Sequence, residues 1–417
     1  MERNGFLGRK RNLRTKDILE KELFDLNQKN CNSLREYVKK KKVTWILGAG
    51  VSAPAGLPDW KRMLAGMWTR VTQLEWRGDD LSGGADKIFV NARKNILQTE
   101  DDLDLYYKRA NDASSEDSVG IFDDINVLES AEYMWNYVKS FFHADQEALA
   151  EAVLDSLIKK VLCIKQSQEE LRETLKKQAL GRLAALLGEQ KGSVITYNYD
   201  NLLEFCLEKI EGVRAEDIKI YCDRNNDFCS SPEKINIYHP HGRLNVVETA
   251  EGSESEFTVL TESSYYDLEQ QIYNWQNSIQ AKALMDTSCV FIGFSGDDYN
   301  FRRIIKNTGI QNKYGKKDRE SGGNHFIFIC LDKAVEKFYK KAAEDYCAEK
   351  GTGCPLWDEE MFRFIKTKRE YVYDRIQLVE RLHAQFAYWE KRGITAVWTT
   401  YEELPLCLEG FLDNIMD

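Results

Sequence analysis

The glycine-rich segment at residues 48–52, GAGVS, has the residue types of a loop that binds phosphate groups. It follows the apolar run 43–47, whose pattern predicts a buried strand. Glycine permits positive φ angles in a tight turn and lets a diphosphate approach the main chain without meeting a Cβ atom. Backbone N–H groups and a helix N-terminus then favour an anion. The lysine of a nucleotide-hydrolysing loop and the GxGxxG spacing of a dehydrogenase are both missing, so a plain tight turn is the alternative.

A second polar segment, TYNYD at residues 196–200, follows another strand pattern. It places the amide of Asn198 and the carboxylate of Asp200 at the carboxyl end of that strand. Ligands of open α/β sheets bind at such strand ends. The alternative is an Asx turn in which Asp200 caps the helix that follows.

A third segment, YHPHGR at residues 238–243, contains two of the five histidines, His239 and His241. Imidazole can accept a proton near neutral pH, so either histidine can act as a general base. A metal-binding pair is one alternative, although further ligands at a suitable spacing are missing. A purely structural histidine is the other alternative.

A fourth segment, VFIGFS at residues 290–295, repeats the pattern of the first, because an apolar strand ends in Gly293 and Ser295 and leads into a helix. Asp298, a little further on, is a candidate cap for that helix. Four strand ends with glycine or polar residues together predict one crevice along the carboxyl edge of a sheet.

The elements that must position these segments are strands separated by helical patterns. Besides 43–47, the predicted strands are 193–196, 218–221, 235–238, 257–260, 289–293, 326–331 and 396–399. Strands that alternate with helices predict an α/β fold with a doubly wound, mainly parallel, Rossmann-like sheet. Three helical patterns, near 127–142, 145–163 and 167–187, predict an inserted all-helical subdomain.

These patterns divide the chain into three parts. We expect an N-terminal basic arm and helix at residues 1–30 and a helical insertion at 75–189. The Rossmann-type domain then consists of residues 31–74 and 190–417.

Composition excludes several classes of function. The chain has 417 residues and a formal net charge of −10, which argues against direct nucleic-acid binding through a basic surface. None of the ten cysteines forms a CxxC pair, so we expect reduced thiols and no metal. We also expect no membrane span, because no run of about eighteen apolar residues occurs. The polar N-terminus lacks a secretion signal, which predicts a cytoplasmic protein.

The four segments, in this order, resemble the motifs of the sirtuin-like NAD-binding family. The resemblance rests on GAGVSAPAGLPDW at residues 48–60, then TYNYD, then the HG pair, then GFS. It implies that NAD is bound as the substrate. It also implies that the NAD diphosphate is held by Gly48, Ala49, Gly50 and Ser52. The segment that closes over the nicotinamide end would be Pro58, Asp59 and Trp60, where the family more often has Phe in place of Trp60.

The resemblance also implies roles at the later strand ends. Asn198 would orient the nicotinamide ribose and an attacking water, and Asp200 would contact the carboxamide. His241, directly before the glycine, would be the general base, whereas His239 does not match the motif and would support it. Gly293 and Ser295 would contact the phosphate–ribose region.

Two departures set the chain apart from the zinc-containing protein deacylases of this family: it lacks paired CxxC motifs and it has a large helical segment. Both features resemble the bacterial sirtuin-like effectors of anti-phage defence, which hydrolyse NAD to nicotinamide and ADP-ribose. The resemblance implies a homo-oligomeric abortive-infection effector, with a HerA-like ATPase or a short Argonaute protein as partner. The alternatives are an NAD-dependent protein deacylase and a non-catalytic subunit of a defence assembly that senses NAD or ADP-ribose.

Overall fold

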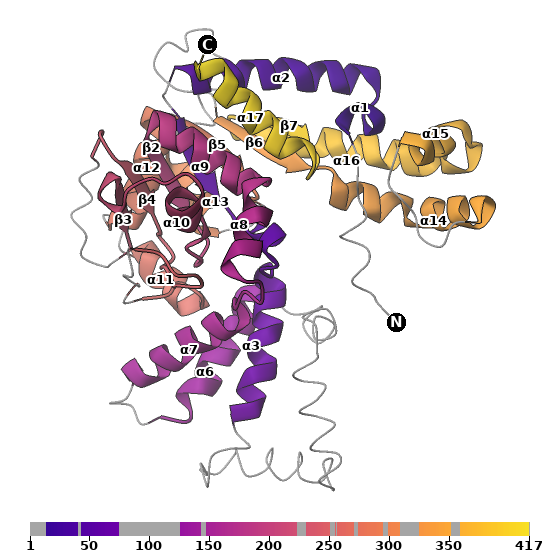
Figure 1. Cartoon of the computed structure of the whole chain (residues 1–417). Helices are drawn as coiled ribbons and strands as arrows, with labels where there is room; N and C mark the ends of the chain where they lie inside the picture. The colour runs from indigo at the N-terminus through magenta and orange to yellow at the C-terminus, as the bar shows by residue number, and fades with distance from the viewer. Residues whose placement is uncertain are drawn as a thin grey trace, which may run out of the picture.

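The computed structural model describes a parallel sheet covered by helices on both faces (Figure 1). The described residues are 14–40, 43–74, 126–142, 147–222, 231–250, 255, 257–270, 274–294, 299–308, 325–351 and 359–416. In this part of the chain the strands are β1 (Val43–Leu47), β2 (Gly192–Thr196), β3 (Ile218–Tyr221), β4 (Ile235–Tyr238), β5 (Ser288–Ile292), β6 (His325–Cys330) and β7 (Ile394–Thr399). All neighbouring strands pair in parallel, in the order β3-β4-β2-β1-β5-β6-β7. The predicted doubly wound α/β fold is therefore confirmed.

The strands are buried on both faces, as parallel strands usually are. In β1, Trp45 and Leu47 contribute to one apolar cluster and Ile46 to another, because successive side chains point to opposite faces. The first cluster includes residues of α2 (Lys21–Lys39), α9 (Ala179–Gln190) and α17 (Glu403–Met416). The second includes residues of α12 (Trp275–Asp286), α13 (Tyr299–Thr308) and α16 (Val372–Glu390).

Helix α2 also covers the outer edge of β7. The Asn27 side chain donates to the carbonyl of Trp398 and accepts from its N–H, both at 2.7 Å, and Asn30 donates to the carbonyl of Ala396 at 2.9 Å. An edge strand exposes unpaired backbone groups that can pair with other chains. These two buried asparagines satisfy such groups on β7.

Two groups of helices extend beyond the sheet (Figure 1). The first consists of α3 (Trp60–Leu74), α6 (Val127–Lys139) and α7 (Glu147–Val161), which pack on one another, with α11 (Glu262–Gln270) beside α6. The second consists of α1 (Thr15–Ile18), α14 (Asp332–Lys350), α15 (Glu359–Thr367) and the first part of α16. The remaining described helices and turns are η2 (Ala49–Val51), η3 (Ala53–Ala55), α8 (Gln168–Lys176), α10 (Leu202–Phe205), the π-turn η7 (Cys206–Ile210), η8 (Ala215–Asp217) and η10 (Arg369–Tyr371). None of the described helices is long and apolar enough to cross a membrane.

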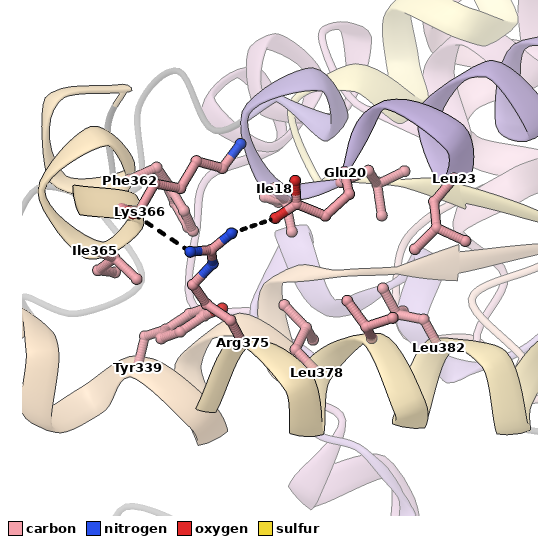
Figure 2. Close-up of a pocket in the computed structure, with 12 residues that line it drawn as sticks. Ile18, Glu20, Leu23, Tyr339, Phe362, Ile365, Lys366, Arg375, Leu378 and Leu382 are labelled. Atoms are coloured by element: carbon pink, nitrogen blue, oxygen red, sulfur yellow. Dashed lines mark hydrogen bonds and ion pairs between the residues drawn. The ribbon is translucent and has the colours of Figure 1, made fainter. Parts of the chain in front are cut away.

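The second group of helices encloses a small cavity of about 10 Å³ (Figure 2). Arg375 donates to the carboxylate of Glu20 at 2.8 Å and to the carbonyl of Lys366 at 3.3 Å, and apolar side chains surround it. This volume has room for about one water molecule. The side chains around the cavity therefore connect these helices, and the cavity itself is too small to hold a nucleotide.

Two sequence-based expectations differ from the structure. Residues 257–260 form no strand, because Val259 donates to the carbonyl of His241 and accepts from the hydroxyl of Tyr199, both in loops. The pattern at 167–187 belongs to two helices, α8 and α9. The predicted domain boundaries stay predictions.

Candidate functional site

The four segments singled out in the sequence follow four adjacent strands, β4, β2, β1 and β5. The chain leaves β1 towards β2 on one side and leaves β5 towards β6 on the other. Connections that diverge in this way leave a crevice at the carboxyl ends of the strands, where doubly wound proteins bind nucleotides. The predicted common edge is therefore present, and its centre lies between the loops after β1 and β5.

These two loops are in direct backbone contact. Gly48 donates to the carbonyl of Ile292 and Gly50 to that of Gly293, each at 3.0 Å. A Cβ atom at Gly48 would lie 2.6 Å from the carbonyl oxygen of Gly293, and one at Gly50 would lie 2.8 Å from its Cα. The glycines therefore allow the loops to pack together.

The positive φ angles are not at Gly48, the first glycine of the loop, but at other glycines. Gly48 has a φ of −123°, which most residues adopt, whereas Gly56 and Gly293 have φ angles of 85° and 63°. At Gly293 a Cβ would also lie 2.5 Å from the backbone nitrogen of Val51. Gly293 is therefore required both by its own conformation and by its contact with the loop after β1.

Most backbone N–H groups of the loop after β1 already have acceptors within the protein. Those of Gly48, Gly50, Val51 and Ser52 all donate to backbone carbonyls. Within the part of the chain that the structure describes, no acceptor is seen for the N–H of Ala49, which is an exposed residue. A bound phosphate can therefore use the Ala49 amide without breaking the loop.

The expected helix N-terminus is not beside this loop. Helix α3 begins only at Trp60, and the exposed carboxylate of Asp59 accepts from the N–H of Arg62 at 3.0 Å. Asp59 thus caps the helix and supplies the negative charge that its N-terminus favours. Pro58, just before it, is half-buried.

A chain of hydrogen bonds connects the first two segments. The side-chain nitrogen of Asn198 donates to the carbonyl of Gly48 at 3.2 Å and to the hydroxyl of Ser52 at 3.0 Å. The Ser52 hydroxyl donates in turn to Asp200 at 2.8 Å. A carbonyl only accepts, so the contact with Gly48 sets the orientation of the Asn198 amide. Its oxygen Oδ1 accepts no hydrogen bond from any residue that the structure describes.

Asp200 is a buried carboxyl with two partners. Besides the Ser52 hydroxyl, it accepts from the N–H of Leu202 at 3.2 Å, which is the Asx turn given as the alternative, although the residue at the cap position of α10 is Asn201. Burial raises the pKa of Asp200 to about 6, although both hydrogen bonds act to lower it. The same residue therefore forms the turn before α10 and is bonded to Ser52 of the glycine loop.

Aromatic rings surround His241, which is 4% exposed. Tyr197 lies edge-to-face against its ring, with centroids 4.9 Å apart. Tyr265, on α11, lies edge-to-face against the same ring, with centroids 5.3 Å apart. Tyr265 also stacks on Trp60 at 6.1 Å. The glycine after His241 has a φ of 99°, and a Cβ there would lie 2.4 Å from the carbonyl oxygen of Phe257. These contacts place Trp60 and His241 at one aromatic cluster.

His239 belongs to a fully buried charged cluster beneath Asn198. Its Nε2 lies 3.1 Å from Oε1 of Glu204, and Arg243 donates to the same oxygen at 2.8 Å. Burial by itself would raise the pKa of Glu204, but the charges and hydrogen bonds of His239 and Arg243 lower it to about 2. Sequence reasoning missed Glu204. It could have been recognised in the sequence as the one carboxylate in the apolar run LLEF at residues 202–205. A carboxylate buried in such a run needs a charged or hydrogen-bonding partner.

The structure thus brings together most of the predicted site residues. Ser295 lies outside the described residues, so its predicted contact is untested. Among the described residues, no group of three His, Cys, Asp or Glu side chains could hold a metal ion. Tyr197 and Tyr265, which sequence reasoning did not single out, also line the aromatic cluster.

Comparison with known families bears on the family of this chain. No curated protein matches the sequence. The family model of the SIR2-like domain matches residues 192–352, a range that includes Asn198, His241 and Gly293. The glycine loop at 48–52 precedes that range, but its backbone is bonded to Gly293 inside it. The match supports a sirtuin-like family for this chain, and a SIR2-like domain implies NAD binding.

Proposed function

We propose that the protein is an NAD⁺ glycohydrolase, which cleaves NAD⁺ to nicotinamide and ADP-ribose. The observation that carries this proposal is the orientation of Asn198. Both hydrogens of its amide are used by Gly48 and Ser52, so Oδ1 is the atom available to a ligand. A water molecule or a ribose hydroxyl donates to such an oxygen, and this places the reacting oxygen beside the glycine loop.

The reaction needs little covalent chemistry from the protein. The water oxygen forms a bond to C1′ of the nicotinamide ribose, and the bond from C1′ to the nicotinamide nitrogen breaks, with its electron pair leaving on nicotinamide. Positive charge develops on the ribose, and the water loses one proton. His241 is the base that accepts this proton, directly or through a ribose hydroxyl.

The aromatic residues around His241 support the same assignment. Tyr197, Tyr265 and Trp60 form an apolar wall next to the base. Such a wall excludes bulk water, which strengthens electrostatic interactions within the site. A flat nicotinamide ring can pack against it.

The wider role follows from the resemblance to anti-phage effectors. In this proposal the protein depletes cytoplasmic NAD during infection, as a homo-oligomer gated by a HerA-like ATPase or a short Argonaute protein. Hydrolysis without an acyl-lysine acceptor is also in keeping with a sequence that has no CxxC pair.

The test is NAD⁺ turnover by the purified full-length chain, with products identified by mass spectrometry. We expect free ADP-ribose and nicotinamide from the wild type, and about a hundredfold slower release from Asn198→Ala and from His241→Ala. The matched controls are Asn32→Ala on α2 and His383→Ala on α16, both at exposed positions, which should retain activity. Equal nicotinamide release by all five proteins would refute the proposal. Release that depends on an acyl-lysine peptide would identify a deacylase, and tight binding without turnover would identify a sensor.

A further inference from the structure

Helices α2 and α17 bring together two cysteines from distant parts of the chain. Cys31 lies on α2 and Cys407 on α17, and the two helices pack against each other (Figure 1). The two thiols are hydrogen-bonded to each other, and both are free and half-buried. The proposed reaction uses neither residue, so this pair of nucleophilic side chains needs an explanation of its own.

The helical spacing explains why the two thiols meet. Cys31 is four residues after Asn27, which bonds to the backbone of β7, and therefore lies on the same face of α2. Cys407 is four residues before Phe411, a member of the apolar cluster beneath α2 and α17. Both cysteines pack against that cluster. The contact between them is thus made by two helices that the core holds in place.

Two thiols in contact do not ionise alike. When one loses its proton, the S–H of the other can donate to the thiolate, which favours the first ionisation and opposes the second. The hydrogen bond from Cys407 lowers the pKa of Cys31, and the charge of Arg35, one turn along α2, acts in the same direction. Burial and the carboxylate of Glu403 act against this lowering. The hydrogen bond to Cys31 and burial both raise the pKa of Cys407.

Three other described cysteines lie in settings that retain the thiol proton. Burial raises the pKa of Cys206, and it raises the pKa of Cys289 to about 12. Cys330 donates to the carboxylate of Asp332 at 2.9 Å. The thiolate is the form that reacts with oxidants, so these three thiols are less reactive than Cys31.

We propose that Cys31 and Cys407 are a redox-sensitive pair of thiols, which hydrogen peroxide oxidises to a disulfide that links α2 to α17. Disulfides that form in cytosolic proteins are usually transient and respond to oxidants. The structure has the two parts that such a pair needs, a thiol that can ionise and a second thiol beside it. This proposal does not rest on the proposed hydrolase activity.

The oxidation transfers two electrons from the two sulfurs to the peroxide. The Cys31 thiolate attacks one oxygen of hydrogen peroxide, the O–O bond breaks, and the other oxygen leaves as hydroxide, which takes up the proton that Cys31 has lost. The Cys407 sulfur then attacks the Cys31 sulfenic acid, whose hydroxyl leaves as water with the Cys407 proton. Two thiols and one peroxide thus give one disulfide and two water molecules, and a dithiol reductant restores the thiols.

The first experiment maps the disulfide in the full-length chain. The reduced protein is treated with hydrogen peroxide, its remaining thiols are alkylated, and its tryptic peptides are identified by mass spectrometry without reduction. Trypsin releases Cys31 within residues 30–35 and Cys407 within residues 393–417, and neither peptide has a second cysteine. We expect these two peptides to be linked in the monomer band of a non-reducing gel, before the exposed Cys163 is oxidised.

Three results of this experiment would overturn the proposal. They are the absence of the linked peptide, a link that forms only between two chains, and oxidation of Cys163 ahead of the pair.

The second experiment uses serine variants to separate the two thiols. Cys407→Ser keeps a hydroxyl donor beside Cys31 but cannot close the disulfide, so a Cys31 sulfenic acid should accumulate and react with dimedone. Cys31→Ser should take up no dimedone at Cys407, and the matched control Cys163→Ser should form the disulfide at the wild-type rate. Absence of dimedone at Cys31 in Cys407→Ser would contradict the assignment of Cys31 as the thiol that reacts with peroxide.

The third experiment measures what the disulfide does to the fold. The link would close a loop that contains most of the chain, and cross-links that close long loops stabilise most. The apparent Tm of the oxidised wild type should therefore rise by about 5 °C above that of the reduced protein, and fall back after treatment with dithiothreitol. An equal rise in Cys31→Ser or Cys407→Ser would show that peroxide acts elsewhere. None of these measurements involves NAD, so they decide the proposal even where the hydrolase assay fails.

Discussion

Asp200 gives the sharpest quantitative prediction, because burial and hydrogen bonding act on its pKa in opposite directions. The carboxyl is buried and accepts from Ser52 and Leu202, yet its pKa is raised from an ordinary value of 3.8 to about 6. The perturbation is Asp200→Asn, which keeps the size and shape of the side chain but cannot ionise.

The magnitude follows from the difference between the folded and unfolded pKa. The folded state holds the Asp200 proton more tightly than the unfolded chain does, so the carboxyl stabilises the fold below about pH 4. This contribution is lost as the pH rises through 6. At about 1.4 kcal/mol for each pH unit, the rise in pKa corresponds to about 3 kcal/mol.

The assay is urea unfolding of the wild type and of Asp200→Asn between pH 4 and 7.5, followed by tryptophan fluorescence. The free energy of unfolding of the wild type should fall relative to that of the variant by about 3 kcal/mol between pH 4 and 7. Asp286→Asn, which changes an exposed carboxyl on α12, is the matched control. A difference between wild type and Asp200→Asn that stays constant with pH, or that grows in the opposite direction, would refute the reasoning.

Glu204→Gln should remove about 3 kcal/mol of stability at pH 7, because the lowered pKa of Glu204 stabilises the fold above about pH 4.5 and this is lost as the pH falls towards 2; urea unfolding at pH 7 that matches the wild type would contradict this. Gly48→Ala should weaken NAD binding about tenfold by calorimetry, since its Cβ meets a backbone oxygen at 2.6 Å. The matched control Gly56→Ala, which has a φ of 85° and whose Cβ meets no atom of the described residues within 4 Å beyond its chain neighbours, should cost about 1 kcal/mol in stability and leave binding unchanged. Asn27→Ala should destabilise the fold by about 2–4 kcal/mol in thermal or urea unfolding, because it leaves two backbone groups of β7 unpaired; a loss below about 0.5 kcal/mol would argue that water replaces the side chain.

Much of the fold could be predicted because parallel strands are buried on both faces and appear as short apolar runs. The runs at 43–47, 218–221 and 235–238 are strands with these same limits. The run FTVL at 257–260 has the same composition but is no strand, because its backbone partners are the loops of Tyr199 and His241. The composition of a segment shows that it is apolar, but it does not show which backbone groups will lie beside it in the fold.

The site was predicted in part, for a similar reason. A position at the end of a strand could be recognised for Asn198 and His241, and parallel pairing then places such ends at one edge. The partner of Glu204 could not be recognised, because His239 lies 35 residues away in the chain. Nor could the contact between Ser52 and Asp200, which are 148 residues apart.

The sequence by itself determined the class of fold, the order of the strands along the chain and the residue types at their carboxyl ends. Only the tertiary structure decided what those residues touch. The strand order puts β1 between β2 and β5, so Gly48 is needed for a close approach to Gly293 and the amide of Asn198 is turned by the Gly48 carbonyl. The physical reason is that hydrophobic periodicity encodes which face of an element is buried, whereas hydrogen bonds between distant loops depend on how the elements are arranged in the sheet.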